Sequence, residues 1–135
     1  MPQLTKQYKF CAAHRYWNDA WDETRNRQAF GDDVQLHGHN YELDITVTGP
    51  ISPETGFLVD LMALNKLIQQ RVIDNLDHSR IDTDIPWFKN RQPSTEYMVQ
   101  YIWDQIVNDM PGSTQLVRVR LRETPTIFCE YFGSN

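Results

Sequence analysis

The tripeptide His37-Gly38-His39 is the stretch of the chain best suited to metal chemistry. In an extended strand, side chains at positions i and i+2 point to the same face, and a glycine between them lets the backbone approach a ligand closely. A third histidine, His14, ends the strand-like stretch that begins at Tyr8 and includes Phe10. Three imidazoles with an open fourth position form the ligand set expected of a catalytic zinc, so the pattern predicts a Zn²⁺ site at His14, His37 and His39. The alternative is that these histidines are partly buried and hydrogen-bond to neighbouring backbone groups.

The fourth histidine, His78, directly follows Asp77. Histidine has an ordinary pKa of about 6.5, which suits proton exchange at neutral pH, and a neighbouring aspartate can orient its ring. Adjacent residues do not face each other on a regular helix, so we expect this pair at a helix end or in a loop. The alternative is a solvent-facing helix terminus, where the helix dipole mildly favours a protonated histidine.

Glu123 continues the apolar side of a strand, two residues beyond Leu121. A carboxylate on the inward face is costly unless it meets a partner or a cavity. His39 begins the apolar side of its own strand in the same way. Polar side chains at inward-facing strand ends predict a pocket.

Composition favours a soluble globular protein with one domain over residues 1–135. Of the 135 residues, 40% are hydrophobic and 23% are charged. No apolar run approaches the roughly 20 residues of a membrane span, and residues 1–6 lack the apolar region of a secretion signal. We therefore expect a cytoplasmic protein that does not bind membranes. The two cysteines, Cys11 and Cys129, are too few for a disulfide framework and are expected to be buried free thiols.

The net charge of −5 argues against a nucleic-acid partner, because phosphate backbones require a basic surface. An anionic small molecule remains compatible with this charge if a few cations gather locally. The alternative for each cation is an ordinary surface charge. The candidates are Arg15, Arg25, Arg27, Lys89 and Arg91.

Periodicity predicts the element order β-β-α-α-β-β, an α+β chain with its helices on one face of an antiparallel sheet. A short helix is expected in 22–30, and longer ones begin near Asp60 and at Ser94 or Thr95. In the third strand, three arginines alternate with apolar residues and are expected to pair with Glu42 and Asp44: Arg118, Arg120 and Arg122. The four strands are predicted over 8–14, 39–48, 115–123 and 126–132.

Six short motifs resemble, in the same order, those of the 6-pyruvoyl-tetrahydropterin synthase and 6-carboxy-tetrahydropterin synthase family. The resemblance extends from about Lys6 to Tyr131. The motifs are Phe10-x-Ala12-Ala13-His14-Arg15, His37-Gly38-His39-Asn40-Tyr41, Thr55-Gly56-Phe57-Leu58-Val59-Asp60, Leu76-Asp77-His78, Pro93-Ser94-Thr95-Glu96 and Arg122-Glu123-Thr124.

The resemblance implies a tunnelling fold, in which trimers close their sheets into a barrel and two trimers stack into a homohexamer with active sites at subunit interfaces. It also implies a zinc-dependent carbon-oxygen lyase acting on 7,8-dihydroneopterin triphosphate, with His14, His37 and His39 as the zinc ligands. The sequence does not choose between 6-pyruvoyl, 6-carboxy and 6-hydroxymethyl products, nor between tetrahydrobiopterin and queuosine biosynthesis.

The remaining site residues are assigned by the same resemblance. Asp77 and His78 would form a proton relay. Glu123 would anchor the guanidine-like edge of the pterin ring, and Thr95, with Ser94, would add hydrogen bonds to the pterin.

One departure from the family pattern concerns the catalytic base. The family has a base cysteine four residues before the first histidine of the H-G-H motif, where this chain has Asp33, preceded by Asp32. Cys11 has the wrong strand parity to replace it, and nothing in the sequence brings Cys129 to the site. A carboxylate is the weaker base, by roughly four to five pKa units in model peptides.

Three hypotheses follow for Asp33. It is a substitute base, as a glutamate is in the subgroup that cleaves the side chain to 6-hydroxymethyl-dihydropterin, or it is a fourth zinc ligand, or it belongs to a solvated loop in a protein without the usual activity. We predict a working pterin enzyme. A non-catalytic paralogue that binds zinc and pterin is the alternative.

Overall fold

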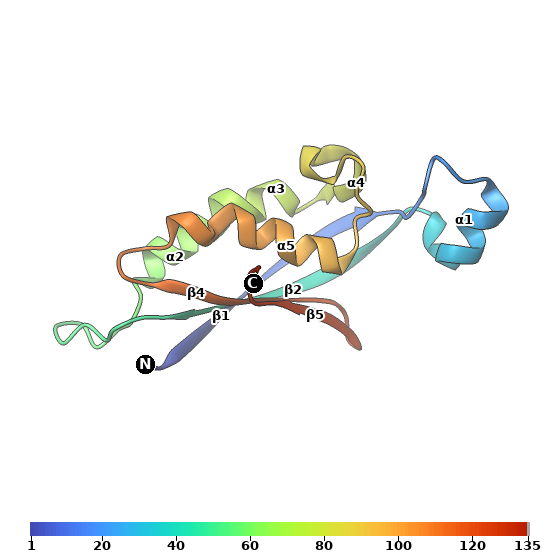
Figure 1. Cartoon of the computed structure of the whole chain (residues 1–135). Coiled ribbons are helices and arrows are strands. Elements are labelled where there is room, and N and C mark those ends of the chain that lie inside the picture. Colours follow the sequence, from blue (N-terminus) through green and yellow to red (C-terminus); the bar gives the residue numbers. More distant parts are fainter. Residues whose placement is uncertain (135) are drawn as a thin grey trace.

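The computed structural model describes residues 1–134, which form one five-stranded sheet with helices on one face (Figure 1). The strand order is β3-β1-β2-β4-β5, and every neighbouring pair is antiparallel except β1 and β3. The strands are β1 (Gln3–His14), β2 (His37–Thr48), β3 (Ser79–Arg80), β4 (Gln115–Thr124) and β5 (Ile127–Tyr131). The four long strands were all predicted, although β1 begins at Gln3 rather than at Tyr8. The two-residue parallel strand β3 was not predicted.

The helices gather over the sheet, apart from α1, which projects beyond one end of it (Figure 1). Their bounds are α1 (Glu23–Phe30), α2 (Leu61–Ile68), α3 (Asp74–Leu76), α4 (Ile81–Asp84) and α5 (Thr95–Ile106). A π-helical turn, Gln69–Ile73, joins α2 to α3. The 3₁₀ turns are Gly31–Val34, Pro86–Phe88 and Val107–Asp109. Among residues 1–134, no helix is both long and apolar enough to cross a membrane.

The core lies between the sheet and the helices. The alternation predicted for β2 is confirmed, since its inward residues Tyr41, Leu43, Ile45 and Val47 are at most 1% exposed. They pack with residues of α2 and α5 such as Leu64. This packing fixes the register of β2, because a slip of one residue would turn the whole apolar set to the other face.

Side-chain caps place the two main helices where the sequence predicts them. Asp60 accepts hydrogen bonds from the backbone N–H groups of Met62 at 3.0 Å and Ala63 at 3.3 Å. The Ser94 hydroxyl accepts one from the N–H of Tyr97 at 3.2 Å. Each cap satisfies donors that the first helical turn leaves without an intrahelical partner.

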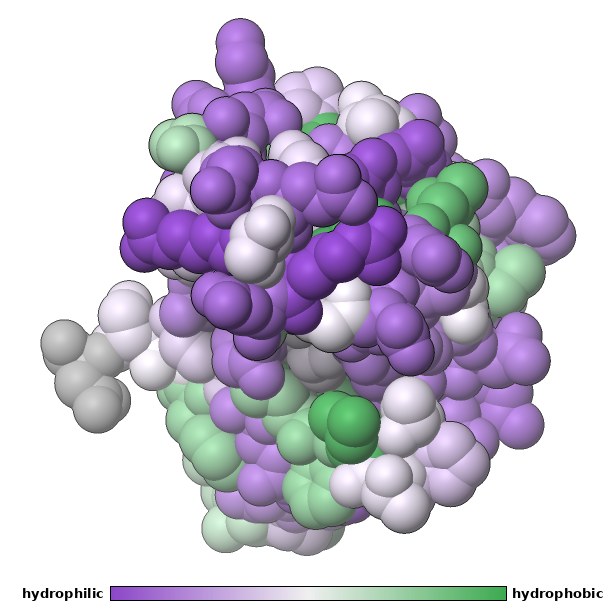
Figure 2. Space-filling view, turned by 90° about the vertical axis from the view of Figure 1, so that its right-hand side faces the viewer, coloured by the Kyte–Doolittle hydropathy of each residue, from purple (hydrophilic) through white to green (hydrophobic). Residues whose placement is uncertain are grey.

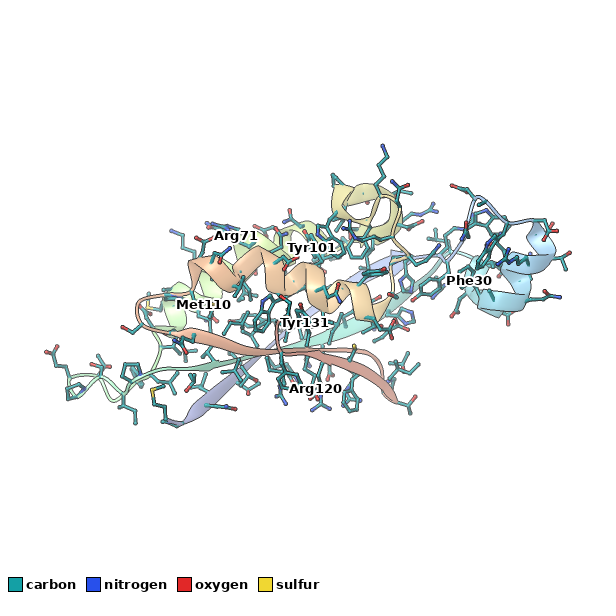
Figure 3. All side chains as sticks on the ribbon, viewed as in Figure 1. Phe30, Arg71, Tyr101, Met110, Arg120 and Tyr131 are labelled. Atoms are coloured by element: carbon teal, nitrogen blue, oxygen red, sulfur yellow. The ribbon has the colours of Figure 1, made fainter. Side chains whose placement is uncertain are left out.

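The ion pairs predicted across β2 and β4 do not form among the described residues. Arg120 and Arg122 stand opposite Asp44 and Glu42 in register, but both guanidinium groups lie over the ring of Phe128 instead. Figure 3 shows Arg120 on the face of the sheet opposite the helices and Tyr131 on the helical side. Arg118 pairs with Glu130 of β5, with Nη1 and Oε1 3.1 Å apart. The neighbouring strand β5 therefore supplies the partners of all three arginines, in place of Glu42 and Asp44.

The cysteine prediction holds in part. Cys11 and Cys129 are both free thiols, but each is partly exposed rather than buried. Neither belongs to the packed centre of the core.

Candidate metal centre

Strand pairing brings three histidines together at the end of the sheet from which α1 projects. His14 stands opposite His37, and Ala12 stands opposite His39, so the three rings share one face of the β1–β2 ribbon. Potential ligand atoms of the three rings all lie within 4.8 Å of one another. A Cβ atom on Gly38 would come within 3.3 Å of the Ala12 carbonyl oxygen, so glycine permits this close pairing.

Backbone carbonyls orient two of the three rings. The Nδ1 atom of His14 lies 2.8 Å from the Pro93 carbonyl oxygen, and that of His37 lies 2.8 Å from the Gln35 carbonyl oxygen. Because a carbonyl can only accept, each Nδ1 donates the hydrogen bond, and Nε2 is the nitrogen left to bind a metal. Histidines that bind a metal through one ring nitrogen commonly donate a hydrogen bond from the other nitrogen, which fixes the orientation of the ring.

The opposite ring nitrogens are ready to bind a cation. The Nε2 atoms of His14 and His39 are buried and have no hydrogen-bond partner among the described residues. Burial lowers the pKa of His14 and of His39, which keeps both rings neutral. The alternative interpretation was that these histidines only hydrogen-bond to backbone groups. It accounts for Nδ1 of His14 and His37, but it does not explain why the buried Nε2 atoms of His14 and His39 lack a partner. The donor set therefore fits a divalent metal ion such as Zn²⁺.

Glu123 lies beside this cluster, near the end of β4. Its Oε1 is 3.6 Å from Nε2 of His39, and its Oε2 accepts a hydrogen bond of 2.6 Å from the hydroxyl of Thr95. The Glu123 side chain is 13% exposed. The inward carboxylate thus has a partner in Thr95 and lies beside the histidine cluster. Ser94 lies next to Thr95 but uses its hydroxyl to cap α5.

Asp33 also lies beside the histidines. It belongs to the 3₁₀ turn Gly31–Val34, and its Oδ1 is 3.7 Å from Nε2 of His37. Its side chain is 59% exposed, so solvent reaches it readily. The Asp33 carbonyl accepts a hydrogen bond from the N–H of Tyr16, which ties this turn to the end of β1.

Asp77 and His78 form a separate group at the other edge of β1. They occupy the turn after α3, as expected for residues that do not share a regular helix. Asp77 Oδ1 accepts a hydrogen bond from the N–H of Cys11 at 3.0 Å, and its Oδ2 lies 3.1 Å from Nδ1 of His78. The Cys11 N–H is the main cause of the lowered pKa of Asp77.

The Asp77–His78 pair does not contact the three histidines within one chain. Cys11 has the opposite strand parity to His14, and no hydrogen bond or ion pair in residues 1–134 joins the two groups. A shallow cavity of about 350 Å³ lies on the side of the pair, and its lining includes Cys11, His39 and His78. Within the described residues of one chain, the predicted proton relay and the predicted metal ligands are therefore two separate groups.

Two tyrosines near the histidines, Tyr16 and Tyr41, were not predicted as site residues from the sequence. The ring of Tyr16 is 5.0 Å from that of His14 between centroids. The Tyr41 hydroxyl is buried and has no partner among the described residues. Burial raises the pKa of both tyrosines, which keeps their hydroxyls neutral. The available signal for Tyr41 was its strand parity, which is that of His39.

Comparisons with known proteins agree with this geometry. A family model described as 6-pyruvoyl tetrahydropterin synthase matches residues 3–134. The 6-pyruvoyl tetrahydrobiopterin synthase of Drosophila melanogaster is 34% identical over 132 residues, which are 96% of this chain and 79% of that protein. The 6-carboxy-5,6,7,8-tetrahydropterin synthase of Bacillus subtilis (strain 168) is 31% identical over 111 residues, which are 78% of this chain and 73% of that protein.

A solved structure extends the similarity to the fold. The 6-pyruvoyl tetrahydropterin synthase of Caenorhabditis elegans matches with a TM-score of 0.88 and 30% sequence identity, covering 99% of this chain and 98% of that one. The predicted α+β tunnelling fold is thereby confirmed. The chain belongs to the 6-pyruvoyl tetrahydropterin synthase family.

Proposed function

We propose that this protein is a zinc-dependent lyase that acts on 7,8-dihydroneopterin triphosphate and forms a 6-pyruvoyl- or 6-carboxy-tetrahydropterin. One observation carries the proposal. The three histidines converge with buried, unpartnered Nε2 atoms on His14 and His39, directly beside the Glu123–Thr95 pair. A metal-binding group and a hydrogen-bonding carboxylate thus lie within reach of one small molecule.

The metal would be held by His14, His37 and His39, whose free nitrogens suit Zn²⁺. When bound, Zn²⁺ supplies a Lewis acid that polarises the hydroxyl or carbonyl groups of the substrate side chain. The chain contributes the orientation of the ligands, through the carbonyl oxygens of Pro93 and Gln35.

Glu123 would bind the pterin ring. The guanidine-like edge of a pterin presents N–H donors in one plane, which a carboxylate accepts with both oxygens. The Thr95 hydroxyl donates to Oε2 of Glu123 and so holds the carboxylate, and it would lie beside a pterin bound there. Ser94 would assist mainly by capping α5 and so holding Thr95 in place.

Asp77 and His78 would move protons, with Asp77 orienting the His78 ring through Nδ1. Because this pair does not contact the histidine cluster of its own chain, we infer that it serves the metal centre of a neighbouring subunit in a homohexamer. The edge strand β5 supports subunit contact, since Ile127 and Phe128 are about half exposed at 50% and 47%. The assembly and a cytoplasmic location remain part of this proposal.

Asp33 would be the base in place of the family's cysteine. Its distance of 3.7 Å from Nε2 of His37 supports a position at the substrate side chain. The same distance leaves open a role as fourth zinc ligand or as a bystander. With Asp33 as the base, cleavage to 6-hydroxymethyl-dihydropterin is the alternative reaction. With Asp33 as a bystander, the alternative function is binding of zinc and pterin without turnover.

The test incubates metal-loaded protein with 7,8-dihydroneopterin triphosphate and identifies the products by mass. We expect turnover by the parent and a loss of about 100-fold or more in Asp33→Ala, as for removal of a general base. Asp32→Ala is the matched control, because Asp32 is an exposed aspartate of the same turn. Full activity in Asp33→Ala would exclude Asp33 as the base, and activity that appears only in Asp33→Cys would support the binding-only alternative.

A further inference from the structure

A polar cavity of about 650 Å³ is lined by Arg15, which follows His14, and by Pro93, whose carbonyl oxygen holds the His14 ring. Its lining comes from the chain that follows β1, from β3 and α4, and from residues 88–93 before α5. Figure 2 looks onto this end of the molecule and shows that hydrophilic side chains cover most of its upper part.

The charges of this cavity are unlike those of the whole chain, whose net charge is −5. Its basic lining residues are Arg15, Arg80, Lys89 and Arg91, and its acidic ones are Asp19 and Asp82. Arg80 contacts Asp82 with Nε at 3.1 Å and Nη2 at 3.0 Å, so these two charges neutralise each other. Three cations and one carboxylate remain in the lining, and none of these four side chains forms an ion pair within residues 1–134. They are Arg15, Lys89, Arg91 and Asp19.

Two of the free cations are held in place before any ligand binds. The Arg91 guanidinium lies 4.2 Å from the Trp87 ring centre and donates a hydrogen bond of 2.7 Å to the Trp87 carbonyl oxygen. The Arg15 guanidinium lies 4.7 Å from the Trp17 ring centre. Aromatic stacking restrains a guanidinium while leaving its edge free to bind an anion.

Arg15 also has an unsatisfied donor. Its Nε atom is buried and has no hydrogen-bond partner among the described residues. A buried donor on a charged group is costly unless an acceptor completes it. An anionic oxygen in the cavity would supply that acceptor.

Hydrogen bonds connect the cavity lining to the backbone segments that hold the histidine cluster. The Gln92 amide donates to the Trp17 carbonyl oxygen at 2.9 Å and accepts from the Trp17 N–H at 3.2 Å. Arg15 follows the proposed ligand His14, and Pro93, which lines the cavity, accepts the hydrogen bond from the His14 ring. The cavity is therefore built on the same backbone segments that orient the metal ligand.

We propose that this cavity binds a polyphosphate anion through Arg15, Lys89 and Arg91. Guanidinium and ammonium groups that converge without carboxylate partners are the usual protein ligands of phosphate oxygens. Two sources share this chemistry: the triphosphate of the pterin substrate or product, and a separate polyphosphate such as a nucleotide. The assignment to the pterin triphosphate rests on the proposed function. Binding of a polyphosphate as such does not, because the cavity and its charges are properties of the chain itself.

The experiment titrates the full, metal-loaded chain with inorganic tripolyphosphate by calorimetry at low ionic strength. The metal content is measured before and after, because tripolyphosphate chelates divalent cations. We expect one site per chain, weakened at least tenfold in the K89Q/R91Q double variant and weakened by added salt. The control K66Q/R71Q removes the same charge from exposed positions of α2 and the following π-turn, and should bind within twofold of the parent. No saturable binding by the parent, or equal binding by K89Q/R91Q, would overturn the proposal.

Kinetics separate the two sources. If the substrate's triphosphate occupies the cavity, tripolyphosphate inhibits competitively and K89Q/R91Q raises KM at least tenfold with kcat unchanged. If a separate anion occupies it, KM stays the same and tripolyphosphate binds together with the substrate. The calorimetric measurement of tripolyphosphate binding does not require turnover. A protein that binds tripolyphosphate but has no lyase activity would therefore contradict the proposed function and support the anion site.

Discussion

Proton competition at the histidine cluster gives a prediction that a change of pH alone can test. An imidazole must be neutral to bind a metal, so acid weakens metal affinity. For a histidine with the ordinary pKa of about 6.5, lowering the pH from about 7.5 to about 5.5 reduces the neutral fraction about tenfold. Three such ligands would together lower the affinity about a thousandfold.

The structure predicts a smaller loss of metal affinity on acidification. Burial lowers the pKa of His14 and of His39, so both rings stay neutral further into the acid range than a histidine in water. The Glu123 carboxylate opposes this effect by raising the pKa of the same two rings. We therefore expect a loss well below a thousandfold in the parent, and a still smaller one in Glu123→Gln.

The assay is the Kd for Zn²⁺, measured by competition with a chromophoric chelator at several values between the two pH limits. His78→Gln is the control, because the His78 side chain is 80% exposed and lies outside the cluster. Its pH profile should match that of the parent. A thousandfold loss would show that these rings ionise as in water. A loss in Glu123→Gln as large as that in the parent would show that Glu123 does not act on the ligands.

Three further predictions concern binding, assembly and folding. Glu123→Gln should raise KM for the pterin substrate by about 10- to 100-fold, the cost of a charge-assisted hydrogen bond, whereas the surface variant Glu130→Gln should leave KM unchanged. Asp77→Asn and His37→Ala should each be inactive, but mixed oligomers of the two should regain measurable activity if each site draws on two chains; no recovery after verified mixing would refute that arrangement. Asp60→Ala should lower the free energy of unfolding by about 1 kcal/mol in urea titrations, because it removes the acceptor that caps α2.

The sequence predicted the long elements well because their signals are local. Alternation in β2 and caps at Asp60 and Ser94 depend on residues close together in the chain, and both reappear in the structure. The strand β3 was missed because two residues carry no periodicity. Its pairing with Ala12 and Ala13 depends on contacts far apart in sequence.

The candidate site could be predicted in its parts but not in its arrangement. Parity predicted the convergence of His37 and His39 and the inward position of Glu123. It could not show that Asp77 pairs with the backbone of Cys11 at the opposite edge of β1, because that contact spans 66 residues. The arginines of β4 were assigned wrong partners for a different reason: the prediction weighed only β2 as their neighbour, whereas Phe128 and Glu130 of β5 hold them.

The proposed ligands lie on both sides of residues 15–36, with His14 before this stretch and His37 and His39 after it. A shared cation would therefore act as a removable cross-link at the base of the excursion that contains α1, much as a disulfide limits the freedom of an unfolded chain. Chelation should loosen residues 15–36 before it disturbs the far end of the sheet. Protein made in metal-poor medium should then be cut first by proteases within this segment, while its core remains intact.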